Sequence, residues 1–186
     1  IVSSKFEYED ALEFGIAKNK IHIIPMGVNV DETPDIETDN ETLQLLFVGR
    51  IARVRRIELL LQAVAKLTFP VHLTLVGAEE KTSSVTRSGY LQELKAWVQK
   101  TNLNNKVTFA GRKSPEELKA YYKNADIFVY PSQYENFGQP LLEAAAHGLP
   151  IVATQVGIAR DIVIEGETGY LTSGDPKSMS DRIQIL

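Results

Sequence analysis

Short apolar runs recur along the chain, and each is bounded by Gly or Pro. Every run holds four or more apolar or β-favouring residues, which is typical of strands that are buried on both faces of a sheet. The pattern therefore predicts five strands, at residues 43–49, 71–77, 106–111, 126–131 and 149–154.

Helical patterns separate these runs. Apolar residues recur at helical spacing between Ile57 and Leu67, and again between Leu91 and Val98. Residues 114–118, SPEEL, join an N-cap serine to a proline at the first helical position and acids in the first turn. Strands that alternate with helices of this length indicate right-handed βαβ units. We therefore expect an α/β fold with a doubly wound, mostly parallel, Rossmann-like sheet.

The chain before residue 43 follows a different pattern. Residues 31–42 are acidic, polar and without periodicity, which indicates a solvated linker and a domain boundary. Residues 1–30 hold a helical pattern at 8–14 and a strand-like run at 20–29, as expected for the last helix, strand and exit of a preceding domain. Because the first residue is Ile, we expect a piece of a longer protein, truncated at its C-terminal end as well.

Composition and charge exclude several classes of protein. The 186 residues carry a formal net charge of -4, and no nucleic acid is expected as a partner because a phosphate backbone calls for a clustered basic face. The chain has no cysteine, so it holds no disulfide or thiolate metal site. No apolar run approaches the roughly 20 residues of a membrane span. We expect a cytoplasmic protein that meets a membrane only through parts outside this chain.

Four arginines follow the first predicted strand. Arg50 stands directly after Gly49, and Arg53, Arg55 and Arg56 lie in the turn toward the next helix. Open parallel sheets bind ligands outside the carboxyl ends of their strands, and a guanidinium group pairs with phosphate oxygens bidentately. The cluster is therefore a candidate diphosphate clamp. A solvated basic face is the alternative interpretation.

Residues 132–154 read SQYENFGQPLLEAAAHGLPIVAT and carry two carboxylates, Glu135 and Glu143. Pro140 suits the first position of a helix, which places Glu143 near the first turn and Glu135 in the loop ahead of it. Gly138 leaves backbone amides open to a ligand, and free amides at the start of a helix favour an anion. The two carboxylates can then bind different parts of one polyhydroxylated ligand. Alternatively, Glu135 only caps the turn and Glu143 is a solvated acid.

The run from Glu135, ENFGQPLLEAAAHGLPIVAT, resembles the Glu-x7-Glu signature of the retaining, sugar-nucleotide-dependent glycosyltransferases of group 1, family 4. Further pieces match the family in order and spacing, and together they span nearly the whole chain. They are KIHIIPMGVN, LLFVGRIARVRRIELLLQA, LTLVGAEE, VTFAGRKSPEELKAYYKNADIFVYPS and IVIEGETGYLT. The resemblance implies the GT-B fold, in which two Rossmann-like domains face a cleft. Residues 43–186 would be the sugar-nucleotide-binding domain in its C-terminal half.

The resemblance also implies a role for each matching residue. Glu143 would hold the ribose of the donor nucleotide, and Glu135 would stand beside the transferred sugar. Arg50 and Arg55 would bind the diphosphate and, with Glu135, form the catalytic set. The remaining donor-binding residues are Gly49, the loop residues Asn136, Phe137, Gly138 and Gln139, and, around the nucleobase, Gly77, Gly111, Arg112 and Lys113.

Several positions depart from the family's pattern. Arg55 stands where lysine is usual, and Arg56 where glycine is usual. In the segment VGIARDI, Ile158 replaces the second of two glycines, and Arg160 and Asp161 replace a Pro-Glu pair. These changes leave the detail of the donor loops open.

The activity implied is transfer of a sugar from a nucleoside-diphosphate sugar, of the UDP, GDP or ADP type, to an acceptor hydroxyl with retention of anomeric configuration. The nucleotide sugar is a co-substrate, and no metal or other cofactor is expected because no Asp-x-Asp motif occurs. The acceptor would bind mainly to the missing N-terminal domain, without which this chain is expected to be inactive. A sugar-nucleotide-binding module without transfer activity, or another GT-B enzyme such as a phosphorylase or a nucleotide-sugar epimerase, is the alternative.

Overall fold

Six parallel strands form one sheet in the computed structural model, which describes residues 1–29, 41–79 and 89–186. The strands are β1 Leu43–Val48, β2 Val71–Val76, β3 Val107–Gly111, β4 Ile127–Tyr130, β5 Ile151–Thr154 and β6 Gly169–Thr172. Their order across the sheet is β3-β2-β1-β4-β5-β6. β1 pairs with β2 along its whole length and with β4 on its other side. The predicted fold class, a doubly wound parallel sheet, is confirmed.

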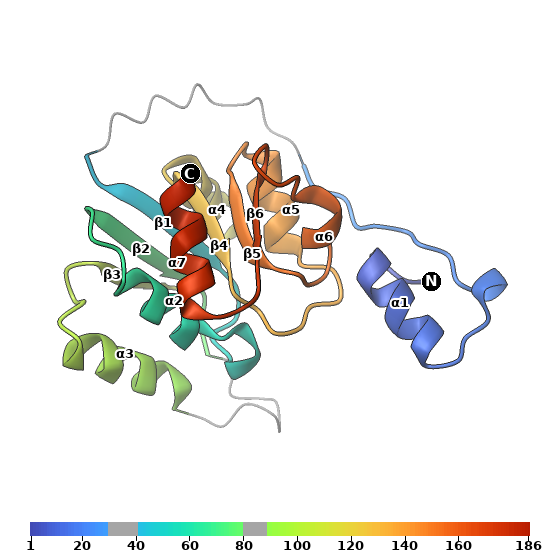
Figure 1. The fold of residues 1–186 in the computed structure, drawn as a ribbon, viewed down its shortest axis with the longest axis horizontal. Coiled ribbons are helices and arrows are strands. Elements are labelled where there is room, and N and C mark those ends of the chain that lie inside the picture. Colours follow the sequence, from blue (N-terminus) through green and yellow to red (C-terminus); the bar gives the residue numbers. More distant parts are fainter. Residues whose placement is uncertain (30–40, 80–88) are drawn as a thin grey trace.

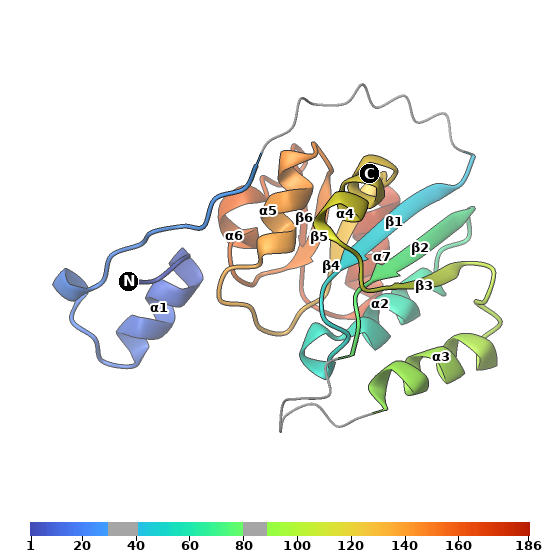
Figure 2. The same cartoon turned by 180° about the vertical axis from the view of Figure 1, so that it is seen from behind.

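Helices connect the strands and cover both faces of the sheet. They are α1 Lys5–Glu13, α2 Ile57–Val64, α3 Tyr90–Lys100, α4 Pro115–Lys123, α5 Gln139–Ala146, α6 Ala159–Ile162 and α7 Pro176–Ile185, with 3₁₀ turns η1 Lys18–Lys20 and η2 Arg53–Arg55. Figure 1 shows α2 and α7 over one face, and Figure 2 shows α4 and α5 over the other. None of the described helices combines the length and the apolar character needed to cross a bilayer.

The core follows from the apolar runs. β4 and β5 are buried along their whole length, and so are the last four residues of β1. Both faces of these central strands lie under helices, which is why their apolar residues are continuous rather than alternating. All five predicted strands are confirmed, with ends that differ by no more than two residues.

The sixth strand, β6, is not predicted by the periodicity of the sequence. β6 is as long as β4 and β5, but its four residues, GYLT, include a glycine and only two apolar residues. Gly169 has a φ of 144°, and a Cβ at this position would stand 1.9 Å from the carbonyl oxygen of Ile151 in β5. Only glycine permits this approach between the two strands, so the pairing depends on tertiary packing that a local pattern does not record.

Two sequence predictions concern the starts of helices. α4 begins as SPEEL predicts: Ser114 Oγ accepts the Glu117 amide, and the Glu117 carboxylate accepts the Ser114 amide. α5 begins one residue earlier than predicted, because Gly138 with a φ of 91° is its N-cap. Pro140 is therefore the second helical residue, and the prediction that Glu143 lies near the first turn is wrong, since it occupies the second.

The N-terminal segment lies to one side of the sheet, beside α5 and α6 (Figures 1 and 2). α1 confirms the predicted helix and begins at Ser4, whose side chain accepts the Glu7 amide at 3.1 Å. The strand expected at residues 20–29 is wrong in its extent. Among the described residues it is a single bridge between Val2 and Ile23, because a strand needs a pairing neighbour along its length. The acidic linker predicted at 31–42 falls almost entirely outside the described residues.

Candidate functional site

The strand order creates one point where successive connections leave the sheet on opposite sides. β1 and β4 are neighbours, but the chain runs outward from β1 to β2 and β3 before it returns to β4. The loops after β1 and β4 therefore diverge and leave a crevice at the carboxyl edge, which is where open α/β sheets bind ligands. Gly49 and Arg50 follow β1, and residues 131–138 lead from β4 to the start of α5.

A cavity of about 690 Å³ lies at this crevice. Arg50 and Arg55 line it from the loop after β1, and Glu135 and Gly138 line it from the loop after β4. The basic turn and the start of α5 therefore share one hollow, as an anion held between them requires. Other predicted donor-binding residues on its wall are Gly49, Asn136, Phe137 and Gln139.

Arg55 is buried beside this cavity, and its guanidinium group has several partners. Its guanidinium group forms an ion pair with Glu135, and its Nη1 donates to Ser132 Oγ at 2.9 Å and to the carbonyl of Tyr134 at 3.1 Å. A buried cation needs partners of this kind because removal from water is costly. The predicted phosphate clamp is therefore a mixed site, in which guanidinium groups and a carboxylate line the same hollow.

Tyr130 orients the carboxylate of Glu135. The Tyr130 hydroxyl donates to Glu135 Oε2 at 2.7 Å, and the tyrosine itself is buried in β4. Burial raises the pKa of Tyr130 well above its ordinary value, and the nearby cation Arg55 opposes this rise. The hydroxyl consequently keeps its proton and remains a donor. Glu135 is thus held between a hydroxyl and a guanidinium group, and it is more than the simple turn cap of the alternative interpretation.

Glu143 lines a second cavity, of about 450 Å³, together with Lys119, Gln139 and His147. The Tyr122 hydroxyl donates to Glu143 Oε2 at 2.8 Å. Burial, and then the carboxylate of Glu143, raise the pKa of Tyr122, so this hydroxyl also stays protonated. The ring of Tyr122 stacks on His147 with centroids 4.9 Å apart. Glu143 is therefore an oriented, half-buried carboxylate rather than a solvated acid.

A third cavity, of about 230 Å³, lies where β1, β2 and β3 end. Gly49, Gly77, Arg112 and Lys113 line it. Gly77 has a φ of 145°, and a Cβ there would stand 1.8 Å from the carbonyl oxygen of Gly49, so only glycine lets the two loops approach. The carbonyl of Gly111 accepts the Gly77 amide at 2.9 Å. Backbone groups therefore form much of this wall.

The three cavities adjoin one another through shared residues. Gly49 and Arg50 line the first and the third, Gln139 lines the first and the second, and Leu118 lines the second and the third. The residues predicted for sugar, diphosphate and ribose therefore line neighbouring cavities at the carboxyl edge of the sheet, as do Gly77, Arg112 and Lys113 of those predicted for the base, whereas Gly111 lines none of the three.

The four arginines of the basic turn separate into two groups. Arg50 and Arg55 line the cavity, whereas Arg53 pairs with Glu93 of α3 at 2.6 Å on the surface. Arg56 adopts the left-handed conformation, with a φ of 50°, and donates to the carbonyl of Gly174. This conformation explains why glycine is usual at the position in the family that the sequence resembles. Arg50 and Arg53 are exposed, as a solvated basic face requires, but Arg50 also lines the cavity, whereas Arg55 is buried and Arg56 half-buried.

Sequence reasoning missed three residues of the site. Tyr122 and Tyr130 orient the two glutamates, and Ser132 holds Arg55. The sequence gives little sign of the two tyrosines' role. Tyr130 lies in an apolar strand and Tyr122 lies in an amphipathic helix, so the pattern indicates a packing residue in each case. Among the described residues, no group of three or more His, Asp or Glu side chains is placed to hold a metal ion.

Comparison with known proteins identifies the family. The family model for glycosyl transferases group 1 matches residues 30–186. The chain therefore belongs to the glycosyl transferases of group 1. The match covers the whole sheet and every residue of the three cavities that the sequence analysis selects.

Individual relatives and solved structures agree with this assignment. The D-inositol 3-phosphate glycosyltransferase of Corynebacterium urealyticum is 31% identical over 205 residues, which cover 100% of this chain and 47% of the relative. The structure of sucrose-phosphate synthase from Thermosynechococcus elongatus has a TM-score of 0.83 and 32% identity, and the match covers 99% of this chain and 47% of that one.

A more distant structure shows the fold alone. Anabaena HepE, solved in complex with UDP-glucose, has a TM-score of 0.84 and 22% identity over 99% of this chain and 52% of its own. The chain spans about half the length of the curated relatives it matches. These matches confirm that the sheet is one Rossmann-like half of a GT-B glycosyltransferase.

Proposed function

We propose that the protein transfers a sugar from a nucleoside-diphosphate sugar to an acceptor hydroxyl with retention of anomeric configuration, and that this chain is its donor-binding domain. The observation that carries the proposal is the cavity that Arg50, Arg55, Glu135 and Gly138 share at the crevice between β1 and β4. Membership of the glycosyl transferases of group 1 supports the same class of reaction.

In this proposal the donor spans the three neighbouring cavities. Its diphosphate lies between Arg50, Arg55 and the start of α5, where free amides and the helix dipole favour an anion. Its ribose lies at Glu143, whose carboxylate Tyr122 already orients. Its base occupies the third cavity, which Gly77 lines, and the carbonyl of Gly111 accepts the Gly77 amide beside it. The side chains of Arg112 and Lys113 lie on the wall of the same cavity.

The reaction breaks the bond between the anomeric carbon and the oxygen of the β-phosphate. Negative charge builds on the leaving diphosphate, and the acceptor hydroxyl gives up its proton to the leaving phosphate oxygen as the new glycosidic bond forms. Cations and amides fixed before the reaction stabilise this charge more in the transition state than in the ground state, and so lower the barrier. Arg50 and Arg55 take this role, assisted by the amides of residues 136–139.

Glu135 takes the position beside the transferred sugar. Tyr130 and Arg55 fix its carboxylate from two sides, so the group can accept hydrogen bonds from sugar hydroxyls without reorganising. The acceptor binds mainly to the domain that this chain lacks. Transfer therefore needs both domains, whereas donor binding does not.

A binding screen tests the proposal. UDP-, GDP- and ADP-glucose are added to the chain and followed by ligand-observed NMR, beginning with the uridine compound because the structural neighbour HepE binds it. One of the three is expected to bind. Glu143→Ala should weaken it about tenfold or more, and Tyr122→Phe should weaken it about fivefold, because each removes a charge-assisted hydrogen bond worth about 1 to 2 kcal/mol.

Tyr170→Phe in β6 is the matched control, since Tyr170 also loses only a hydroxyl but lines none of the three cavities. Its affinity should equal that of the unaltered chain. If none of the nucleotide sugars binds, the donor-domain proposal is wrong. If a sugar nucleotide binds but the longer protein transfers nothing, the alternative of a binding module holds, and consumption of inorganic phosphate would indicate a phosphorylase.

A further inference from the structure

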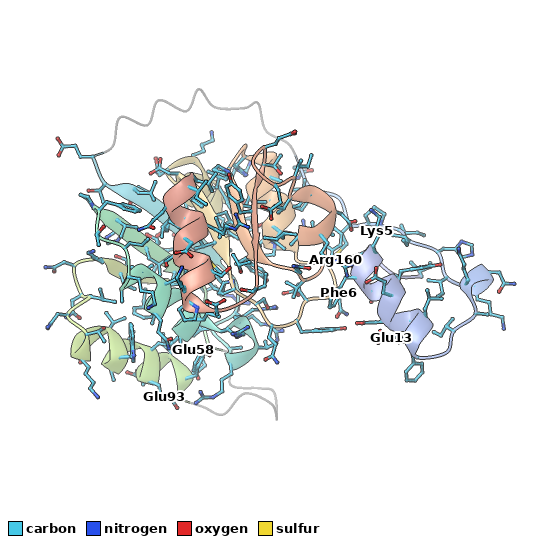
Figure 3. The ribbon with its side chains drawn as sticks, viewed as in Figure 1. Lys5, Phe6, Glu13, Glu58, Glu93 and Arg160 are labelled. Carbon is cyan, nitrogen blue, oxygen red and sulfur yellow. The ribbon has the colours of Figure 1, made fainter. Side chains whose placement is uncertain are left out.

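The segment that departs from the family's pattern, VGIARDI, contacts the N-terminal helix. Arg160 Nη1 of α6 lies 2.6 Å from Glu9 Oε2 of α1, and Lys5 Nζ of α1 lies 2.8 Å from Asp161 Oδ1 of α6. In Figure 3, Arg160 reaches toward α1, and Lys5 and Phe6 project from the side of α1 that is nearest the sheet domain. We call these two ion pairs the α1–α6 charge pairs.

The two pairs have opposite polarity. Lys5 and Glu9 are four residues apart, so they stand on one face of α1 a turn from each other. They meet Asp161 and Arg160 respectively, so a cation and an anion of α1 face an anion and a cation of α6. A shift of α1 by one turn would bring like charges together, and this arrangement therefore selects one register of the helix.

A second group of contacts joins α1 to the loop of the candidate donor site. Ser4 Oγ donates to the carbonyl of Asn136 at 2.5 Å, and the Tyr134 hydroxyl donates to Asp10 at 2.9 Å. The rings of Phe6 and Tyr134 meet edge to face, with centroids 5.6 Å apart. The same helix that the charge pairs hold thus contacts residues 134–136 directly.

The start of α1 also forms part of the cavity wall. Ser3 and Glu7 line the 690 Å³ cavity with Arg50 and Glu135. Glu7 Oε2 accepts hydrogen bonds from the amide and the hydroxyl of Ser3, at 2.6 and 2.8 Å, which fixes the carboxylate at this wall. The position of α1 therefore affects both the shape and the charge of the space assigned to the sugar.

We propose that Arg160 and Asp161 are positioning residues, which hold α1 against residues 134–136 and so order the loop for the sugar of the donor. The proposal rests on the proposed function for the identity of the ligand. Neither residue lines the cavity, so each acts through α1. Their replacement of the family's usual Pro-Glu pair makes this device a property of the present chain.

Charge reversal with rescue tests the proposal. Arg160→Glu places two anions against each other, whereas the pair Glu9→Arg with Arg160→Glu restores attraction in the opposite sense. Lys177→Glu is the matched control, because it makes the same change in net charge at another surface pair, Lys177–Asp181 of α7. For each variant, UDP-glucose and UDP affinities and the hydrogen exchange of residues 5–13 and 132–138 are measured.

Arg160→Glu should weaken UDP-glucose binding about two- to fivefold, the range expected for an exposed pair, and should leave UDP binding nearly unchanged because UDP lacks the sugar. Exchange should accelerate in both peptides. The double variant should recover affinity and protection, and Lys177→Glu should change neither. About 0.5 M salt should reproduce part of the effect in the unaltered chain by screening.

Equal losses for UDP and UDP-glucose, or an absence of rescue in the double variant, overturn the proposal. If the unaltered chain binds GDP-glucose or ADP-glucose instead, that compound and its nucleoside diphosphate take the place of UDP-glucose and UDP. If it binds none of the three nucleotide sugars, the proposed function is lost, and the exchange measurement then decides the positioning role separately. In Arg160→Glu, unchanged exchange at residues 132–138 overturns the positioning role, whereas faster exchange that the double variant reverses supports the positioning role.

Discussion

At the scale of single residues, the site depends on a row of aromatic side chains in the core. Phe47 stacks on Tyr130, Tyr130 on Phe128, and Phe128 contacts Tyr122, with centroids 5.8 to 5.9 Å apart. The two tyrosines of this row donate to Glu135 and Glu143 respectively. The carboxylates are therefore oriented from the rigid interior rather than from mobile surface groups, which favours a preorganised site.

Arg50→Ala should slow transfer more than it weakens donor binding. In the proposed reaction, Arg50 acts on charge that develops as the bond to the β-phosphate breaks, so its loss should reduce kcat by a factor equivalent to about 2 to 4 kcal/mol. Steady-state kinetics of the longer protein, combined with donor affinity from titration calorimetry, measure the two effects separately.

Arg53→Ala is the control for this experiment. It removes the same charge from the same turn, but Arg53 pairs with Glu93 outside the cavity. Its kinetics should match those of the unaltered protein. An unchanged kcat in Arg50→Ala, with the whole loss in affinity, would show that Arg50 only binds the donor.

At the scale of elements, α4 begins at the predicted capping box and carries two residues to the walls of the site. Its capping box fixes the first turn, and the helix carries Leu118 and Tyr122 to the cavity walls. α5 begins at Gly138, whose left-handed conformation turns the loop of Glu135 into the helix of Glu143. The two glutamates, eight residues apart in the sequence, therefore line two neighbouring cavities.

Ser114→Ala should destabilise the fold by about 1 kcal/mol, the usual cost of losing an N-cap side chain. Urea unfolding at neutral pH measures this as a lower midpoint with an unchanged slope. An unchanged midpoint would mean that the first turn of α4 contributes nothing to the cooperative fold.

The partner in this capping box adds a dependence on pH. Hydrogen bonds from the backbone and side chain of Ser114 hold the pKa of Glu117 below its ordinary value of 4.5. A carboxyl group with a lowered pKa contributes stability above the unfolded value, and this contribution is lost as the pH falls through the folded value. Glu117→Gln should therefore be less stable than the unaltered chain at neutral pH, and the gap should close in acid.

At the scale of the whole molecule, the order of the strands decides where the proposed donor site lies. β1 and β4 are adjacent although their paired residues, such as Leu45 and Ile127, are 82 positions apart in the chain. The crevice at this point brings together the arginine turn and the glutamate loop. Neither segment forms a site without the other.

Donor binding should stabilise the whole chain. A nucleotide sugar at about 100 times its Kd should add about 2.7 kcal/mol to the free energy of unfolding, because it binds the folded chain alone. Calorimetry should show the corresponding rise in Tm, which Glu143→Ala should reduce. Addition of a chelator should leave this rise unchanged, and its loss on chelation would reveal a metal requirement.

Much of the fold and of the site could be predicted from the sequence. Apolar periodicity predicts five of the six strands and the helices between them, because the spacing of apolar residues follows locally from which faces of a strand or helix are buried. The basic turn, Glu135 and Gly138 could be selected because they follow a strand end or precede a helix start, and the resemblance to the family singled out Arg50 and Arg55 within that turn. β6 could not be predicted in this way, since GYLT holds only two apolar residues and Gly169 is required by its close approach to the backbone of β5.

The sequence by itself determined the class of fold, and it identified the two glutamates and the basic turn as candidate site residues. Each of these follows from a pattern of neighbouring residues. Only the tertiary structure decided which tyrosines hold the glutamates, which partners hold Arg55, and where α1 lies. These contacts join residues that are far apart in the chain: 21 positions for Tyr122 and Glu143, 77 for Arg55 and Ser132, and 151 for Arg160 and Glu9. No local pattern encodes such pairs, since they arise only when the packed sheet brings distant loops together.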